Sequence, residues 1–155
     1  MRIALISLVL IGGAWQTAVS QQKDFKLSDA EQKLLDLTNA ERAKEKLPPL
    51  KFNPVLCEVA RAHSANMAKQ GKLEHELDGK TPFERIKATG YKYSMGGENV
   101  ARHRAGLEEV MAGWMKSPGH RDNILSNEYT EIGMGAVTDA KGFVYYTQVF
   151  AKPRK

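Results

Sequence analysis

Two histidines and one glutamate are the residues whose types could do chemistry together in this sequence. His75 and His120 each lie just outside a predicted helix or at a turn, and Glu98 opens a predicted strand after two glycines. Neutral imidazole and ionised carboxylate are acceptable ligands for zinc or another borderline divalent ion. Because the three residues are far apart in the sequence, only a fold that brings them together would make a metal site.

The other two histidines have different surroundings. His63 lies on the apolar face of a predicted helix, which favours a buried histidine that hydrogen-bonds within the core. His103 lies between Arg102 and Arg104, whose positive charges discourage cation binding, so a surface position is expected.

Familiar catalytic motifs are present only in part. Residues 120–127 match the kinase pattern H-R-D-x-x-x-x-N, but the chain has no glycine-rich phosphate loop, strand lysine or D-F-G. The H-E pair at residues 75–76 begins like the zinc-protease motif H-E-x-x-H, whose second histidine is replaced by Gly79. Cys57 lies on an apolar helix face and is a poor nucleophile. No catalytic class follows from these fragments.

Capping signals predict three helices that must position these residues, and apolar spacing predicts a fourth. A Ser28–Glu31 capping box predicts a helix that continues to about residue 46. The same pattern occurs twice: a capping residue, a proline at the first helical position and a glycine at the end. It predicts helices over residues 54–70 and 82–89. Apolar residues at helical spacing predict a fourth helix over residues 107–116, before the S-P-G turn.

Strands are predicted mainly at the end of the chain. A loop over residues 91–97 precedes a strand start at residues 98–101, and two strands over residues 132–137 and 143–150 are joined by a turn. This order of elements predicts an α+β domain with helices packed on a mostly antiparallel sheet.

Length and composition agree with one globular domain. The chain has 155 residues, 42% hydrophobic and 26% charged, which excludes collagen-like and wholly disordered proteins. Its formal charge is +5, but the basic residues are scattered, so no nucleic-acid partner is expected. The single cysteine, Cys57, excludes an intramolecular disulfide and is expected to be buried.

The first twenty residues have the pattern of a secretory signal peptide. Arg2 is followed by an apolar run over residues 3–11, and Ala18 and Ser20 are the small residues of a cleavage site. The run is too short to cross a bilayer of about 30 Å. We expect a signal peptide at 1–20, a polar segment at 21–30, the domain at 31–151 and a basic tail at 152–155. The mature protein would then be secreted, to the extracellular space or the periplasm and cell envelope, and not integral to a membrane.

Several segments resemble a known family. These are L-T-N-A-E-R at 37–42, H-S-A-N-M-A at 63–68, G-E-N-V-A at 97–101, S-P-G-H-R-D-N-I-L at 117–125 and Y-T-Q-V-F at 146–150. In this order the chain resembles the CAP superfamily, the cysteine-rich secretory, antigen 5 and pathogenesis-related proteins, whose domain is also called SCP. The resemblance runs from about Leu34 to Phe150 and is to the bacterial, disulfide-free branch.

The resemblance implies a three-layer α-β-α sandwich with a central cleft of two histidines and two acidic residues. It places His75, Glu98 and His120 in the cleft, with Asn99 beside Glu98, and it implies that the three hold a divalent ion such as zinc. The fourth acidic position is Ser117 in this sequence, which weakens the implied metal site.

Three classes of function remain open from the sequence. The favoured one is a secreted, non-catalytic binding module for a small apolar ligand such as a sterol or lipid, a glycan or an extracellular partner. The alternative is a metal-assisted, peptidase-like hydrolase in which His75 and His120 hold the ion and Glu98 is ligand or general base. The third is a structural protein of the cell envelope with a vestigial cleft. Binding is favoured because no activated nucleophile is visible and the fourth acid is absent.

The cleavage signal predicts that the mature protein begins at Gln21, because Ala18 and Ser20 satisfy the small-residue rule of signal cleavage. The intact mass of the exported protein measures this directly. A mature species that still carries the apolar run at residues 3–11 would show a membrane-tethered protein instead.

Overall fold

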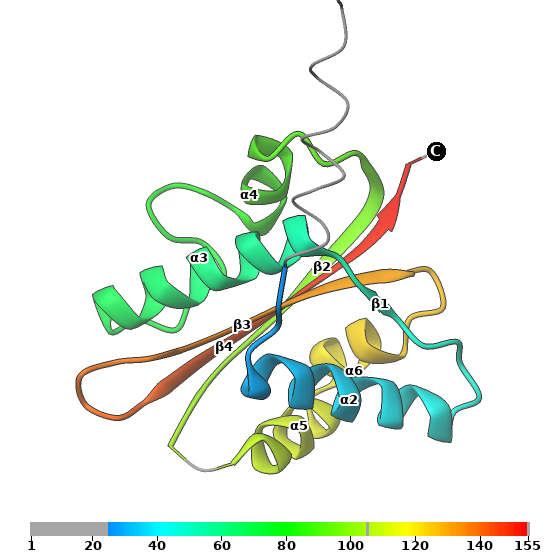
Figure 1. Cartoon of the computed structure of the whole chain (residues 1–155), viewed down its shortest axis with the longest axis horizontal. Helices are drawn as coiled ribbons and strands as arrows, with labels where there is room; N and C mark the ends of the chain where they lie inside the picture. The colour runs from blue at the N-terminus through cyan, green and yellow to red at the C-terminus, as the bar shows by residue number, and fades with distance from the viewer. Residues whose placement is uncertain (1–24, 105, 155) are drawn as a thin grey trace, which may run out of the picture.

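The computed structural model describes residues 25–104 and 106–154 (Figure 1). The expected signal peptide, its cleavage site and residues 21–24 lie outside the described residues. The elements are α2 (Asp29–Lys44), β1 (Lys51–Phe52), α3 (Pro54–Gln70), α4 (Pro82–Ala88), β2 (Tyr93–His103), α5 (Leu107–Lys116), α6 (Pro118–Leu125), β3 (Glu131–Thr138) and β4 (Val144–Pro153).

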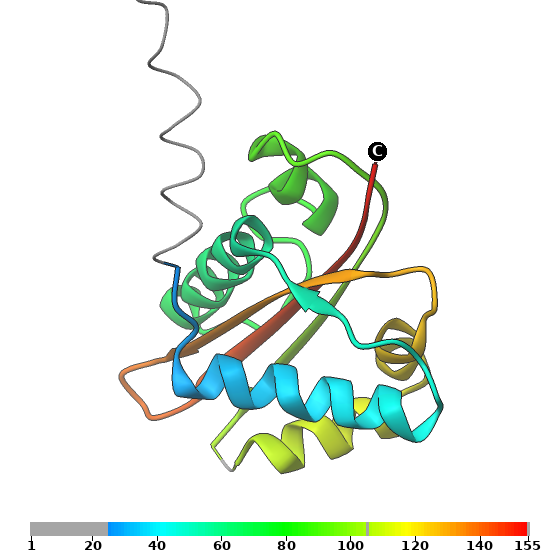
Figure 2. The ribbon, with the colours of Figure 1, turned by 45° about the vertical axis from the view of Figure 1, so that its right-hand side comes forward.

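The strands form one sheet between two layers of helices. The strand order is β1-β3-β4-β2; β1 and β3 are parallel, and the other neighbours are antiparallel. Helices α3 and α4 cover one face, and α2, α5 and α6 cover the other (Figures 1 and 2). The predicted α+β class and its three-layer α-β-α sandwich are confirmed. Strand β2, which carries Glu98, lies at an edge of the sheet.

The capping signals form as the sequence predicts. Ser28 and Glu31 exchange hydrogen bonds between side chain and backbone at the start of α2. The Asn53 side chain accepts hydrogen bonds from the first turn of α3, and Gly71 ends that helix at a φ of 66°, in the left-handed region where a side chain would be strained. The predicted ends of α3 are therefore confirmed.

Two local predictions are wrong. Residues 93–97 form strand rather than loop, because they pair with β4. Residues 118–125 form helix α6, and His120 lies inside it rather than at a turn, because Pro118 occupies a first helical position. The two-residue strand β1 was not expected. Helix α2 also begins within the polar segment expected at 21–30, and β4 includes residues 152–153 of the expected tail.

The core lies on both faces of the sheet. The larger cluster joins α2, α5 and α6 to the sheet through residues such as Leu34, Met111, Trp114 and Ile124. Cys57, on α3, is fully buried and free, as predicted, and burial raises the pKa of its thiol to about 11. The thiol is thus an inert core group.

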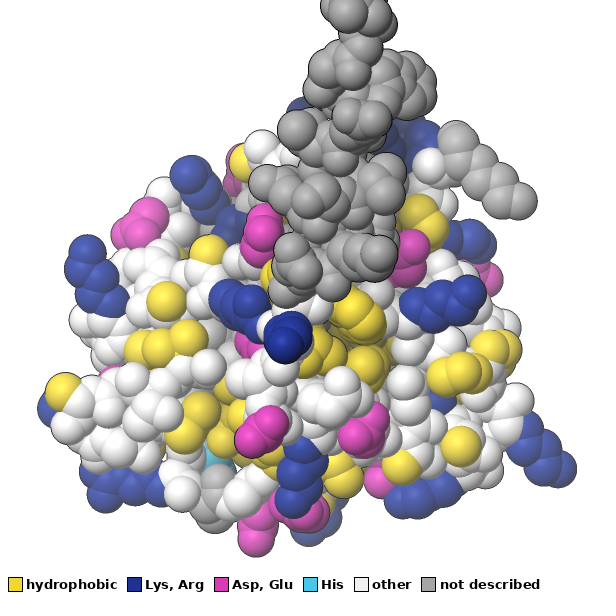
Figure 3. Space-filling model, in the orientation of Figure 1, with side chains coloured by type: hydrophobic (Ala, Val, Ile, Leu, Met, Phe, Trp, Pro, Cys, Tyr) yellow, Lys and Arg dark blue, Asp and Glu magenta, His cyan; other side chains and the backbone are white. Residues whose placement is uncertain are grey.

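The surface carries mixed charge. Figure 3 shows Lys and Arg side chains spread across one face and interspersed with Asp and Glu, as the scattered basic residues of the sequence suggest. Within residues 25–104 and 106–154, no helix is long and apolar enough to span a bilayer.

Two glycines let α3 lie directly on the sheet. A Cβ atom added at Gly133 would collide with the backbone of Leu56, and one at Gly135 with the backbone of Ala60. Both neighbours are backbone atoms of the long helix, which cannot move aside as a flexible side chain could. These glycines therefore set the distance between α3 and β3.

Gly133→Ala should destabilise the protein by about 3 kcal/mol, because overpacking against backbone forces the helix off the sheet. Gly113→Ala is the matched control: a Cβ there meets no described atom within 4 Å, and alanine favours the helix by about 0.5–1 kcal/mol. Urea unfolding measures both. Equal stabilities of the two variants would contradict the close contact.

The substitution Trp114→Ala should lower the free energy of unfolding by about 3–5 kcal/mol, because it removes a buried aromatic side chain from the core. The indole is 2% exposed, and its Nε1 donates a hydrogen bond to the Val100 carbonyl at 3.1 Å. Phe83→Ala, at an exposed ring of α4, serves as the control and should cost about 1 kcal/mol or less. Urea unfolding compares the two. An unchanged midpoint for Trp114→Ala would show that the ring is not a core anchor.

Candidate functional site

The buried carboxylate of Glu98 is the centre of the site. Its side chain is 2% exposed, and both of its oxygens are bonded. Oε1 lies 2.9 Å from His75 Nδ1, and Oε2 accepts a hydrogen bond from Arg85 Nη2 at 2.7 Å. The structure therefore brings His75 and Glu98 together, as the resemblance implies, and adds an arginine to them.

Arg85 connects the segments around Glu98. It lies on α4, and its guanidinium also donates to the backbone carbonyls of His75 and Lys80, at 2.9 and 2.8 Å. One side chain thus fixes the loop between α3 and α4 against β2. Nothing in the sequence around Arg85 distinguishes it from the other basic residues as a member of the site. The one general signal is that a buried glutamate needs a cationic partner, which does not say which arginine or lysine supplies it.

His75 is the accessible member of the pair. Its side chain is 51% exposed, while its Nδ1 faces Glu98. A histidine whose Nδ1–H is held by a carboxylate keeps its Nε2 lone pair free, which is the usual arrangement of a histidine that accepts a proton or binds a metal.

His63 lies behind Glu98. It is 1% exposed. Its Nε2 lies 2.9 Å from the Glu74 carbonyl oxygen and 3.8 Å from Glu98 Oε1. Burial lowers the pKa of His63 more than the neighbouring Glu98 raises it. The prediction of a core histidine is confirmed, although only its Nε2 has a hydrogen-bond partner.

His120 comes from the opposite helical layer. It lies in α6, half-buried, with its ring centroid 6.4 Å from that of Trp114. Burial, followed by the charge of His75, lowers the pKa of His120. Among the described residues, His120 makes no hydrogen bond or ion pair with His75 or Glu98.

Among the described residues, neither Asn99 nor Ser117 makes a side-chain hydrogen bond to the side chains of His75 or Glu98. Asn99 is fully buried; its Nδ2 donates to the His120 carbonyl at 3.1 Å and to Gln148. Since successive strand residues point to opposite faces, Asn99 lies away from the face that Glu98 occupies. Ser117 is the N-cap residue of α6, and its side chain makes no capping hydrogen bond.

The side chains of His75, Glu98 and His120 fit a metal centre with three protein ligands poorly. In the described part of the chain, no group of three or more His, Cys, Asp or Glu side chains has a geometry that could hold a metal ion. Both oxygens of Glu98 are bonded, and the Arg85 cation beside them opposes a second cation. Glu98 is therefore placed to orient His75 rather than to be a ligand.

The comparisons with known proteins agree with this architecture. Residues 35–150 match the CAP cysteine-rich secretory protein family. The Bacillus subtilis protein YkwD is 36% identical over 140 residues, covering 90% of this chain and 54% of YkwD, so the chain spans about half of that relative.

Solved structures share the fold. An extracellular SCP-domain protein of Bacillus anthracis has a TM-score of 0.71 and 26% identity, covering 89% of this chain and 50% of that one. An outer surface protein of Borrelia burgdorferi has a TM-score of 0.75 and 22% identity, covering 79% of this chain and 92% of that one. The matched residues include most of the chain and every element from α3 to β3, and we conclude that the chain belongs to the CAP family of cysteine-rich secretory proteins.

Proposed function

We propose that this CAP protein is a secreted, non-catalytic binding module whose cleft is formed by His75, Glu98 and His120. The observation that carries the proposal is that both oxygens of the Glu98 carboxylate have partners. One lies against His75, and the other accepts a hydrogen bond from Arg85. Its structural neighbours include an extracellular protein and an outer surface protein, which supports secretion.

The hydrolase alternative requires a group that can activate water or attack a substrate. Both oxygens of the Glu98 carboxylate are occupied, one by His75 at 2.9 Å and the other by Arg85 at 2.7 Å, so neither is free to take a proton from a bound water. The Cys57 thiol is buried, with its pKa raised to about 11, and cannot supply a thiolate near neutral pH. These two facts favour binding over catalysis.

His75 is the one group in the cleft that favours the hydrolase. Its ring is exposed and paired with a carboxylate, as in a general base. A general base alone does not complete a hydrolytic site, because it also needs a nucleophile or a metal-bound water.

The cleft has two imidazoles to offer a ligand. His75 reaches solvent from the loop between α3 and α4, and His120 lies in α6 on the other side of the β2 edge. A small apolar ligand, a glycan or a partner's side chain that enters this cleft would meet them first. A divalent ion would be held weakly, by the His75 Nε2 and by His120, with water in the place of the absent acid.

The absence of catalysis can be tested with wild type and Glu98→Gln on casein and on nitrophenyl esters, with and without added zinc. We expect no turnover above buffer for either protein. Turnover by wild type that Glu98→Gln abolishes, while circular dichroism shows that the variant is folded, would show that the protein is a hydrolase.

Zinc titration calorimetry separates metal ligands from the orienting residue. His75→Ala and His120→Ala should lose the binding heat, Glu98→Gln should weaken affinity by about 10–100-fold, and His103→Ala should match wild type. Because imidazole must lose its proton to coordinate a metal, the affinity of the wild type for zinc should fall as the pH is lowered from about 7.5 to about 5.5.

Identical heats for wild type and both histidine variants would contradict a metal role for this cleft. If His75→Ala and His120→Ala instead lose thermal stability in metal-free buffer, the histidines hold the fold together and the cleft is structural.

A further inference from the structure

A cavity of about 340 Å³ lies where the C-terminal end of α2 meets β1. Its walls come from α2, the two-proline turn after it, β1 and the segment between α6 and β3, which meet on the right-hand side of Figures 1 and 2. We call it the Arg42 cavity. None of His75, Glu98 and His120 lines it, so it is separate from the proposed cleft. Its volume is within the range of small-molecule sites, roughly 300–1,000 Å³.

Arg42 brings a buried positive charge to this cavity. The residue is 1% exposed. Its guanidinium donates only to backbone carbonyls, from Nε to Pro48 at 2.9 Å and from Nη1 to Ile124 and Ser126 at 2.8 and 2.7 Å. Within the described part of the chain, it forms no ion pair with a carboxylate. Burial lowers the pKa of Arg42, but a guanidinium keeps its proton in proteins. A buried cation without an anion is therefore left here.

The third nitrogen of the guanidinium is free to bind a ligand. Among the residues that the structure describes, no acceptor faces Nη2. The side-chain atoms that are both fully enclosed and unpaired are His63 Nδ1 and Arg85 Nε, and Arg42 Nη2 is not one of them. Since Nη2 is unpaired but not enclosed, an oxygen atom the size of water can touch it. The cavity that Arg42 lines is the space from which such an oxygen would come.

The other charged residues of the cavity determine the charge of its ligand. Lys51 lines it from β1, is exposed and has no ion pair among the described residues. Glu131 also lines it, but its Oε2 already accepts hydrogen bonds from Tyr91 and Asn53, at 2.6 and 2.7 Å. Arg42, Lys51 and Glu131 together carry one net positive charge. An anion with a single negative charge balances it.

The free donors favour a carboxylate as that anion. Because Nε and Nη1 are already used, Arg42 cannot hold an oxyanion through two of its nitrogens and meets only one oxygen. The second oxygen of a carboxylate is left for Lys51 or for the hydroxyl of Thr130, which also lines the cavity. The exposed rings of Pro48 and Pro49 give an apolar wall for a small organic body.

From these observations we propose that the Arg42 cavity binds the carboxylate of a small organic acid. One carboxylate oxygen accepts a hydrogen bond from Arg42 Nη2, the other faces Lys51, and the organic body lies against the two prolines. A free acid and the C-terminal carboxylate of a peptide offer the same chemistry. The inference goes beyond the proposed function, because it assigns a second site with its own ligand class.

Matched ligands on the mature protein test the need for a single negative charge. The probes are butanoate, its neutral isostere butanamide, inorganic phosphate and N-acetyl-dialanine, each followed by amide NMR shifts and by the Nε–H signal of Arg42. Butanoate should shift the Thr130 amide and the Arg42 signal, and butanamide should bind about tenfold more weakly. Phosphate should bind more weakly than butanoate. Binding of N-acetyl-dialanine tighter than that of butanoate would identify a peptide terminus as the source, and weaker binding would identify a free acid.

Matched variants test the location without touching Arg42, whose bonds hold the end of α6. Lys51→Gln removes the exposed cation of the cavity and should weaken butanoate binding about threefold. Lys92→Gln makes the same change in net charge at an exposed lysine that does not line the cavity, and should bind butanoate like the wild type.

Three results would overturn the inference: equal binding of butanoate and butanamide, tighter binding of phosphate than of butanoate, or equal affinities of the two lysine variants for butanoate. No saturable shift with any probe would show that Arg42 is a structural cation only. Zinc calorimetry of the cleft is independent of each outcome, because neither variant alters His75, Glu98 or His120.

Discussion

The buried carboxylate of Glu98 is the interaction on which the site and its surroundings depend. An ionised carboxylate that is 2% exposed is tolerated only when it is paired, and removing one partner of such a pair typically costs about 3–5 kcal/mol. Its partners come from α4 and from the loop before it. The seven-residue helix α4 has only Ile86 fully buried, so apolar packing alone holds it weakly. The ion pair with Arg85 therefore fixes the α4 side of the domain to the sheet.

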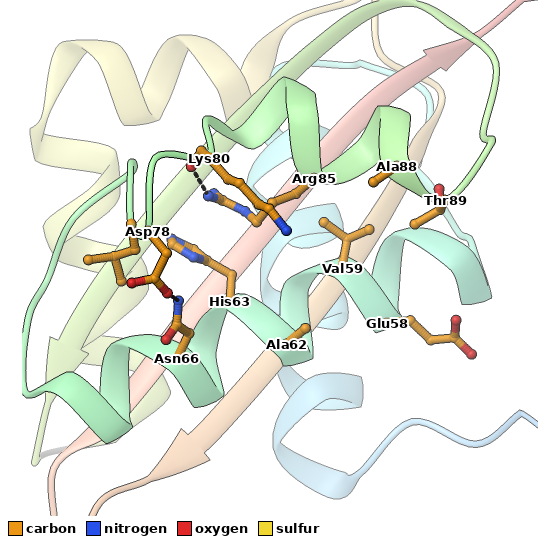
Figure 4. Close-up of a pocket in the computed structure, with 11 residues that line it drawn as sticks. Glu58, Val59, Ala62, His63, Asn66, Asp78, Lys80, Arg85, Ala88 and Thr89 are labelled. Carbon is orange, nitrogen blue, oxygen red and sulfur yellow. Dashed lines mark hydrogen bonds between the residues drawn. The ribbon is translucent and has the colours of Figure 1, made fainter.

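Arg85 also lines the cavity between α3, α4 and the loop that joins them (Figure 4). Its Nη2 is directed at Glu98 and the His75 carbonyl, its Nη1 at the Lys80 carbonyl, and its Nε remains unpartnered beside the cavity. His63 behaves similarly, with Nε2 bonded and Nδ1 free. The Arg85–Glu98 pair thus neutralises the buried carboxylate, while Arg85 Nε, which belongs to the same cation, and His63 Nδ1 have no hydrogen-bond partner.

Local signals predicted the helices well, and long-range pairing explains most of the rest. Capping at Ser28, Asn53 and Thr81 depends on neighbours within three residues, so the sequence contains the whole interaction. The start of β2 at Tyr93 depends on its pairing with Pro153, sixty residues later, which no local pattern reveals. His75 and Glu98 were expected together only through the family resemblance. Arg85 and the cavity could not be predicted, because they arise from tertiary contacts between α3, α4 and β2.

The two histidines of the proposed cleft are held by different physical means. His75 is positioned by charge, through Glu98 and Arg85. His120 is held on the other layer by neutral groups, since Asn99 bonds its carbonyl and joins Gln148, which in turn donates to Thr38 on α2 at 2.7 Å. Neutral amides and hydroxyls do not titrate, so these hydrogen bonds do not depend on pH. The loop that carries His75 is held instead by Arg85, which pairs with Glu98 and donates to the His75 carbonyl. The two sides of the proposed cleft are therefore held by different forces, an ion pair on the α4 side and neutral hydrogen bonds on the α6 side.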